Sequence, residues 1–352
     1  MKIFFIFLVL VVFYSSSAMA QFCSSSLPQS PISKCDYCIA SQGVSPLEAG
    51  SSGIRWDIRS LYLGTPYSGT VKQPTTSATE SYLTNQFTGF YRISKALTAV
   101  VMVPITVRSA EEPLEGDSTM ISSSSKQPQV QHDMVMTGSG MTEHVSSYGL
   151  GDIIAMMRYT AIKFSESSGE EEVISAGSSA MTILSFSAGV KLPTGRTDFM
   201  HDGEYLDSHL QPGSGSTDIV LGTSLLWTLD RTTIATNILG SLPGTGARGH
   251  RFGNYINADL TGRYRILASE DNFSTLAATL GLCGELRAKE TQDGTLLDDS
   301  GGSVLYLSPG VQWIASERIS FEASYHLPIY HYLGGTQLGE SYRMMGGVQY
   351  LF

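Results

Sequence analysis

The sequence is poor in charge and has no long helical pattern, and these two absences narrow the class of protein. Charged residues make up 15% of the chain, compared with about 25% in a typical soluble domain. No long stretch shows the 3.6-residue spacing of an amphipathic helix. After the N-terminal segment, no window is apolar enough for a membrane-spanning helix, so strands must make any membrane span. The net charge of −10 argues against nucleic acid as a partner.

Cysteine is scarce: Cys23, Cys35 and Cys38 lie near the N-terminus, and Cys283 stands apart. The CDYC motif could bind a metal, do redox chemistry or form a disulfide. Ile39 follows where haem attachment needs His, and no further ligands stand at a spacing suited to zinc. In an oxidising compartment, a structural disulfide in this motif is the simplest expectation. Cys283 could pair with one of the N-terminal cysteines, which would require the N-terminal segment to plug a lumen.

A catalytic constellation is missing too. The chain has many serines near His144 and His209, but no GxSxG motif and no fixed spacing between a nucleophile and a base. We therefore expect neither an enzyme nor a cofactor.

The N-terminus has the form of a secretory signal peptide. Lys2 precedes an apolar run over residues 3–14, and Ala-Met-Ala ends a small-residue cleavage site at position 20. The run is shorter than the roughly 20 residues that cross a bilayer, so we expect removal of residues 1–20. Residues 21–50 are rich in Ser and Pro and lack strand alternation. We interpret them as a periplasmic arm or a plug in a lumen.

The end of the chain, SYRMMGGVQYLF over residues 341–352, alternates between an apolar face and a mixed face. Period-two alternation is the mark of a β-strand. A chain that ends in such a strand, on a terminal Phe, resembles the closing strand of a bacterial outer-membrane β-barrel. This resemblance implies that Tyr350 and Phe352 are read by the barrel-assembly machinery.

The same alternation recurs along residues 51–352, where we count about twelve strands. Connections after odd-numbered strands are long, and those after even-numbered strands are mostly very short. Transmembrane barrels show this asymmetry, because their periplasmic turns are short and their outer loops long. We therefore predict an all-β, antiparallel transmembrane barrel. The long connections fall near 65–77, 109–147, 194–215, 245–252, 289–302 and 331–338, the short ones near 94–96, 230–231, 269–272 and 316–317, and 166–178 is the exception.

Nearly every charge within the strands falls on the face opposite the apolar one. A charge facing the bilayer midplane costs about 2–4 kcal/mol in such barrels, so an apolar exterior requires this sorting. These charges either line a permeation pathway or pair with one another inside a closed lumen. The predicted lumen or pore lining is Arg55, Asp57, Arg59, Arg92, Asp152, Arg158, Lys191, Asp259, Arg263, Arg265, Glu285, Arg287, Glu322, His326 and Arg343.

Aromatic side chains on the apolar face lie mostly near strand ends, as in the girdles of membrane barrels. They are Trp56, Tyr62, Tyr91, Tyr159, Trp227, Tyr264, Trp313, Tyr325 and Tyr350.

Three phrases carry a more specific resemblance: GLGDIIAMMRY, SAGVKLPTGRTD and LDSHLQPGSGSTDIVLG. They resemble the outer-membrane barrel family assigned to the phenol meta-degradation pathway, over roughly residues 145–352. That family is similar to channel barrels for fatty acids and aromatic hydrocarbons. The resemblance implies a channel or transporter for hydrophobic small molecules. It assigns no site residue, because the motif residues look structural.

The histidines are predicted in or near the outer loops, with Met134, Met136, Met141 and Met200 beside them. This combination suits copper or another soft metal at the outer mouth, but loops also collect His when strands exclude it. No spacing fixes a ligand set, so we assign no metal. The histidines are His132, His144, His201, His209, His250, His326 and His331.

Together these patterns predict an outer-membrane channel or transporter of a Gram-negative bacterium for a small solute, a hydrophobic or aromatic one being the narrower expectation. Its partners would be the lipid bilayer, the barrel-assembly machinery and the solute. The alternative is a closed structural or surface-interaction barrel with ligand- or metal-binding outer loops.

Overall fold

The computed structural model describes residues 52–74, 78–113, 135–137, 140–166, 180–268 and 274–352. The predicted signal peptide and arm, with Cys23, Cys35 and Cys38, lie outside the described residues, so the predictions about them stay predictions. None of the helical structure in the described ranges is long and apolar enough to cross a bilayer.

The described chain is almost entirely β-strand, as the alternation predicts. The long strands are β1 (Gly53–Gly69), β3 (Thr79–Arg92), β4 (Leu97–Pro113), β6 (Gly140–Leu150), β7 (Ile154–Glu166), β8 (Ala180–Lys191), β11 (Asp218–Leu229), β12 (Thr232–Pro243), β14 (Tyr255–Ala268), β15 (Thr275–Arg287), β18 (Gly302–Ile314) and β19 (Ile319–Leu351). The short elements are β2 (Val71–Lys72), β5 (Val135–Thr137), β9 (Met200–His201), β10 (Glu204–Tyr205), the 3-10 turn η2 (Ala247–Gly249), β13 (His250–Arg251), β16 (Thr291–Gln292) and β17 (Thr295–Leu296).

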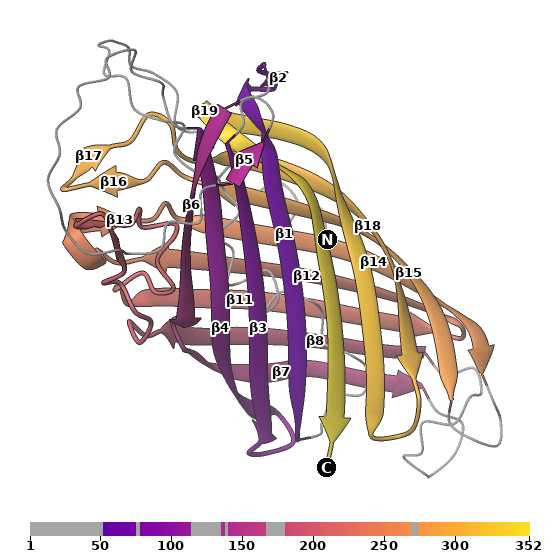
Figure 1. The fold of residues 1–352 in the computed structure, drawn as a ribbon. Helices are drawn as coiled ribbons and strands as arrows, with labels where there is room; N and C mark the ends of the chain where they lie inside the picture. Colours follow the sequence, from indigo (N-terminus) through magenta and orange to yellow (C-terminus); the bar gives the residue numbers. More distant parts are fainter. Residues whose placement is uncertain (1–51, 75–77, 114–134, 138–139, 167–179, 269–273) are drawn as a thin grey trace, which may run out of the picture.

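The long strands other than β6 close into an antiparallel barrel (Figure 1), and β6 pairs with β4. From β1 the hydrogen-bonded order runs through β19, β18, β15, β14, β12, β11, β8, β7, β4 and β3, and β3 pairs with β1 again. At the closing seam Gly53 pairs with Leu351 of β19 on one side and with Phe90 of β3 on the other. Closure leaves the wall without an exposed edge, which a sheet in lipid requires.

The last element, β19, crosses the wall twice. Its residues 320–333 pair with β18, and residues 333–351 pair with β1, both in antiparallel register. The two passes meet at Gly334 and Gly335, and Gly335 has a φ of 62° that favours glycine. Among the described strands, ten ring elements cross once and β19 twice, so the wall has twelve crossings. The long loop predicted at 331–338 is wrong, because the strand pairing continues up to this tight bend.

The two faces of the wall differ as the charge sorting predicts. Trp56 and Ile58 on β1 are exposed to the outside, whereas the alternate residues Asp57 and Arg59 are buried inside. The same alternation continues on β14, where Leu260 faces outward and Asn257 inward. An apolar outer face is what a lipid environment demands, and the polar side chains avoid lipid by pointing into the lumen.

Apart from the bend of β19, the described connections follow the predicted order of long and short. Asp230, with a φ of 49°, and Arg231 form the two-residue turn between β11 and β12. The rim at this turn carries the C-terminus (Figure 1). It also carries a band of exposed aromatic side chains on the outer face. The other rim carries connections that hold the β9–β10 hairpin and the three-stranded sheet β13–β16–β17. The band at the short-turn rim consists of Tyr91, Tyr159, Trp227, Tyr264 and Trp313.

Candidate functional site in the barrel lumen

The lumen is lined by charged and polar side chains that project from neighbouring strands. Most of the predicted lining residues lie on this inner face, either buried or half-buried. They are Arg55, Asp57, Arg59, Arg158, Lys191, Asp259, Arg263, Glu285, Arg287, Glu322, His326 and Arg343.

A cavity of about 100 Å³ lies in the lumen between β12, β14, β15, β18 and β19. Such a volume accommodates several water molecules or a very small solute. Its lining combines ionisable groups with the thiol of Cys283 and the apolar side chain of Met345, both of which are buried. The ionisable lining groups are Asp259, Arg263, Glu322, His326 and Arg343.

Arg343 sits at the centre of a buried ion-pair cluster beside this cavity. Its Nη1 lies 2.6 Å from Oε1 of Glu285, and its Nη2 lies 2.7 Å from Oε1 of Glu340. The guanidinium also donates to the hydroxyl of Tyr306 at 3.0 Å. A guanidinium has five donors in a fixed plane, which suits it to bridge two carboxylates. The cluster therefore fixes a positive charge between two negative ones on the lumen wall.

A second ion pair links the seam strands. Arg55 lies 2.7 Å from Asp57 and also pairs with Glu322 from the first pass of β19. Glu322 is itself part of the cavity lining. Charges on β1 and β19 are thus paired across the lumen side of the wall.

The connection between β8 and β11, residues 192–217, passes over the outer rim, and its mostly buried part, residues 206–216, folds into the lumen. Arg108, on the inner face of β4, donates from Nη1 to the carbonyl of His209 at 2.8 Å and from Nη2 to that of Pro212 at 3.4 Å. The hydroxyl of Ser147 on β6 donates to the carbonyl of Leu210. Inner-face side chains of two strands thus hold this connection against the wall. We call residues 192–217 the inward segment.

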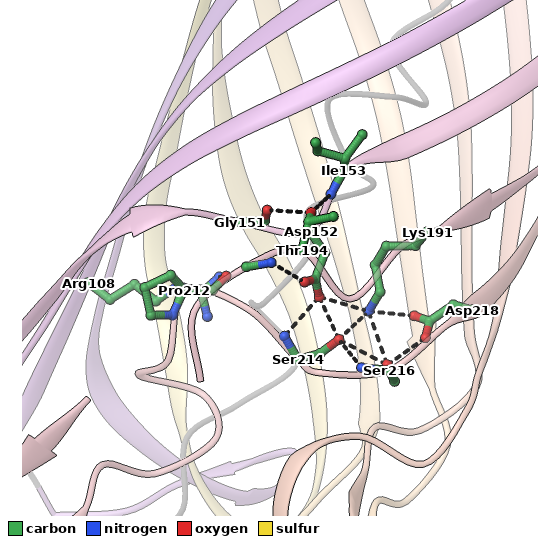
Figure 2. A network of polar contacts seen from close by, with 11 residues as sticks. Arg108, Gly151, Asp152, Ile153, Lys191, Thr194, Pro212, Ser214, Ser216 and Asp218 are labelled. Atoms are coloured by element: carbon green, nitrogen blue, oxygen red, sulfur yellow. Dashed lines mark hydrogen bonds and ion pairs between the residues drawn. The ribbon is translucent and has the colours of Figure 1, made fainter. Parts of the chain in front are cut away.

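The inward segment is latched by one buried cation between two carboxylates (Figure 2). Lys191 Nζ lies 2.6 Å from Asp218 Oδ2 and 3.5 Å from Asp152 Oδ2, and it donates to Ser214 Oγ at 2.7 Å. All three charged side chains are nearly fully buried. Charges taken out of water are tolerated only when paired and hydrogen-bonded, and these groups satisfy one another. We call Asp152, Lys191, Ser214, Ser216 and Asp218 the latch.

Asp152 also holds backbone from both ends of the inward segment. Its Oδ1 accepts from the amide of Gly195 at 2.9 Å, and its Oδ2 accepts from the amide of Ser214 at 2.8 Å. Between these amides, a Cβ on Gly213 would lie 2.4 Å from the carbonyl carbon of Gly195, so the two backbones need glycine to approach so closely. The three phrases that resemble a known family, which are separated in sequence, therefore meet at this one point.

Several predicted placements need correction. Arg92 is exposed at the end of β3, and its Nε donates to the carbonyl of Ser94 at the rim, outside the lumen. Arg265 lies on the inner face but reaches the short-turn rim, where it donates to Asp230. Alternation tells which face a residue occupies but not its depth, which is why both were misplaced. Asp152 is buried, but it stands in the break between β6 and β7 and not within a strand.

Two further predictions concern histidine and cysteine. His326 does not lie at the outer loops: it faces the lumen from the wall strand β19, between the hydroxyls of Ser308 and Ser324 at 2.8 and 3.1 Å. Within the described residues Cys283 is a buried free thiol, and it accepts a hydrogen bond from Asn257. Its predicted pairing with an arm cysteine stays a prediction.

Sequence reasoning missed Asp218, Ser214, Ser216 and Glu340 as lumen groups. Asp218 is the first residue of β11 and lies on its inner face, so the alternation along that strand would have assigned it to the lumen. Glu340 is buried near the bend of β19, between the predicted loop at 331–338 and the predicted last strand, which begins at residue 341. Ser214 and Ser216 belong to a connection, where no periodicity indicates which side chains turn inward.

Comparison with solved structures and known families agrees with this architecture. An outer-membrane channel from Pseudomonas putida F1 superposes with a TM-score of 0.58 at 14% identity, covering 91% of this chain and 99% of that one. The β-domain of the Bordetella autotransporter BrkA has 11% identity and a TM-score of 0.37, covering 86% and 100% of the two chains. A Pseudomonas aeruginosa FadL homologue has 8% identity and a TM-score of 0.34, covering 85% and 90%. The last two superpose too loosely to support an argument.

Comparison with curated proteins gives no match. The match to a family model extends over residues 85–331 and includes the latch and most of the barrel wall. The predicted family resemblance is confirmed: this chain belongs to the family described as "Putative MetA-pathway of phenol degradation".

Proposed function

We propose that this chain is an outer-membrane channel or transporter of a Gram-negative bacterium, which passes a small solute through the barrel lumen without changing it chemically. The observation that carries the proposal is a cavity with converging polar groups inside a wall whose outer face is apolar. A purely structural lumen gains most from tight packing, whereas cavities with a few converging polar groups are the usual form of ligand sites.

The two halves of the lumen have different parts in this proposal. The cavity lies toward the rim with short turns, where it is lined by residues such as Arg263 and Glu322. Toward the other rim, the inward segment fills the lumen with buried groups such as Gln211 and Ser216. Passage of a solute therefore requires the inward segment to move, and the latch holds it in the closed position.

A hydrophobic or aromatic solute is the narrower part of the proposal. It is supported by the family description, which names phenol degradation. The cavity supports it as well, because the buried side chains of Met345 and Cys283 give apolar contacts beside the charged groups. A small aromatic alcohol presents both kinds of surface, an apolar ring and one hydrogen-bonding group.

A second candidate is a closed barrel whose outer connections bind ligands or other surfaces. The dense packing of the outer half favours it, since Arg343, Glu285 and Gln211 are almost completely buried. In that case the paired charges are structural, and the lumen conducts nothing.

Swelling of liposomes that contain the purified full-length barrel separates the two candidates. We expect swelling that falls steeply as the test solute grows, because the pathway is narrow. Uptake of phenolic and fatty solutes by cells with and without the gene tests the solute class. A folded barrel that supports neither swelling nor uptake would leave the closed barrel as the better account.

Targeting and assembly complete the proposal. Export with removal of residues 1–20 would deliver the mature chain to the periplasm, from which the barrel would insert into the outer membrane. Phe352 lies at the short-turn rim, where its amide donates to the carbonyl of Ser52. Tyr350 and Phe352 are exposed there and are the segment that we propose the assembly machinery binds.

A further inference from the structure

Three separate connections at the outer rim bring two histidines and one glutamate into a buried cluster. His209 comes from the inward segment, His250 begins β13, and Glu290 immediately precedes β16. The three side chains are 3%, 6% and 2% exposed. Nε2 of His209 lies 2.9 Å from Oε2 of Glu290, and Nε2 of His250 lies 3.0 Å from the same oxygen.

The hydrogen-bonding roles around His250 are in conflict. Its Nε2 faces the Glu290 carboxylate, and its Nδ1 faces Oε1 of Gln292 at 3.3 Å. The Gln292 amide has a fixed orientation, because its Nε2 donates to the carbonyl of Arg248 at 2.6 Å. Both ring nitrogens therefore face acceptors, but a neutral imidazole has only one proton to donate. A second ring proton satisfies both acceptors, and so does a metal cation bound at Nε2, which leaves the Nδ1 proton for Gln292.

That arrangement is the usual surrounding of a metal-binding histidine, whose second nitrogen donates to a carbonyl or carboxylate that fixes the ring. The carboxylate is oriented as well. The other oxygen of Glu290 lies 3.7 Å from Nη1 of Arg287, and the Glu290 amide donates to Ser300 Oγ at 3.0 Å. Phe252 packs edge-on against both imidazoles, with ring centroids 5.3 and 4.7 Å away. The three donor groups are thus held in place by their neighbours.

We propose that His209, His250 and Glu290 form a binding site for a first-row divalent cation, with zinc as the best fit. Two imidazole nitrogens and one carboxylate oxygen are an established three-residue ligand set for zinc, which takes a fourth ligand from water or solute. The three donor atoms lie within 4.8 Å of one another, close enough for one ion to bind all three. Because each ligand comes from a different connection, a bound ion would join the three connections into one outer cap.

Two other places in the chain could bind zinc and supply the controls. Glu143, His201 and Asp202 form a more exposed group at the same rim. Cys35 and Cys38 form the CxxC motif of the arm. The proposal does not depend on any solute, so its failure can be told apart from failure of the proposed channel.

The test measures zinc binding by the purified full-length barrel in detergent. Binding is measured by titration with zinc alone and by metal analysis after dialysis. The variants are His209→Gln and His250→Gln at the site, with His201→Gln and the Cys35→Ser, Cys38→Ser pair as controls. Heat-modifiable migration in gels checks that each variant is folded. We expect one tightly bound zinc per chain, at least a tenfold loss of affinity in each site variant, and no change in the controls.

Limited trypsin digestion gives a second readout, because Arg196, Arg248 and Lys289 are exposed in the three joined connections. Zinc should slow cleavage at these residues in the unmodified barrel and not in His250→Gln. The proposal is overturned if the folded barrel binds no zinc. It is also overturned if the site variants retain the ion, or if His201→Gln or the cysteine pair abolishes binding.

Discussion

Lys191 Nζ lies 2.6 Å from Asp218 Oδ2 at a depth where both side chains are almost inaccessible to water. This pair joins the last residue of β8 to the first residue of β11, and the whole inward segment lies between them in sequence. Asp152 reaches the same cation from the break between β6 and β7 at 3.5 Å. The latch thus fixes where the inward segment leaves and rejoins the wall.

Replacing the cation should destabilise the barrel strongly. In Lys191→Met, Asp152 and Asp218 remain buried after losing their shared positive charge, and breaking a buried pair in this way costs about 3–5 kcal/mol. The measurement is the temperature at which heat-modifiable migration in detergent is lost. Lys289→Met is the matched control, because Lys289 pairs with the exposed Asp298, and we expect no measurable change there. Equal transition temperatures for the two variants would show that the latch contributes nothing.

The glycine contact within the inward segment should control the opening of the lumen. In Gly213→Ala the new methyl would overlap the Gly195 backbone, so the segment must shift away from its seat. We expect a higher single-channel conductance, by about twofold or more, together with a lower transition temperature. Gly89→Ala is the control, since a Cβ on Gly89 meets nothing within 4 Å. Unchanged conductance in a folded Gly213→Ala barrel would mean that the inward segment does not limit passage.

The charge at Arg343 should set ion preference. Arg343→Gln removes the cation between Glu285 and Glu340 and leaves the lumen wall more negative. A ring of one charge sign governs selectivity in channels, so the reversal potential in a salt gradient should shift toward cations. Arg318→Gln, at an exposed turn, should leave the reversal potential unchanged. A shift toward anions in Arg343→Gln would contradict a path past this cluster.

The lipid-facing exterior predicts a difference between two identical substitutions. Leu260 and Leu296 are both exposed, at 49% and 61%, but Leu260 lies in the middle of β14 and Leu296 in the outer sheet. Leu260→Arg should cost about 2–4 kcal/mol, the penalty for Arg near the bilayer midplane. Leu296→Arg should cost almost nothing because it stays in water. Folding yield into lipid vesicles under urea titration measures both, and similar penalties would place Leu260 outside the bilayer.

Much of the wall could be predicted from the sequence because lipid and lumen impose opposite demands on alternate residues. Asp57 and Arg59 could be assigned inward because they alternate with the apolar residues Trp56 and Ile58. The depth of a residue has no such signal, and for this reason Arg92 was placed in the lumen although it lies at the rim. The bend of β19 was missed because Gly334-Gly335 is too short a signal to separate from a long loop.

The latch and the outer cluster depend on contacts that periodicity does not encode. Asp152 and Lys191 were both predicted to face inward, but their meeting depends on the path of a 26-residue inward segment between Leu192 and Thr217. His209, His250 and Glu290 lie in three connections, and nothing in their spacing brings them together. Only the closed order of the strands, which makes β8, β11, β12, β14, β15 and β18 neighbours, places these connections at one point of the rim.

Single-channel recording tests the central claim most directly. The purified full-length barrel, shown to be folded by heat-modifiable migration, is inserted into a planar bilayer in concentrated potassium chloride. The account predicts discrete conductance steps of a narrow pore, which become larger when Gly213→Ala displaces the inward segment. A folded barrel that gives no steps, either unmodified or as Gly213→Ala, would contradict passage through the lumen.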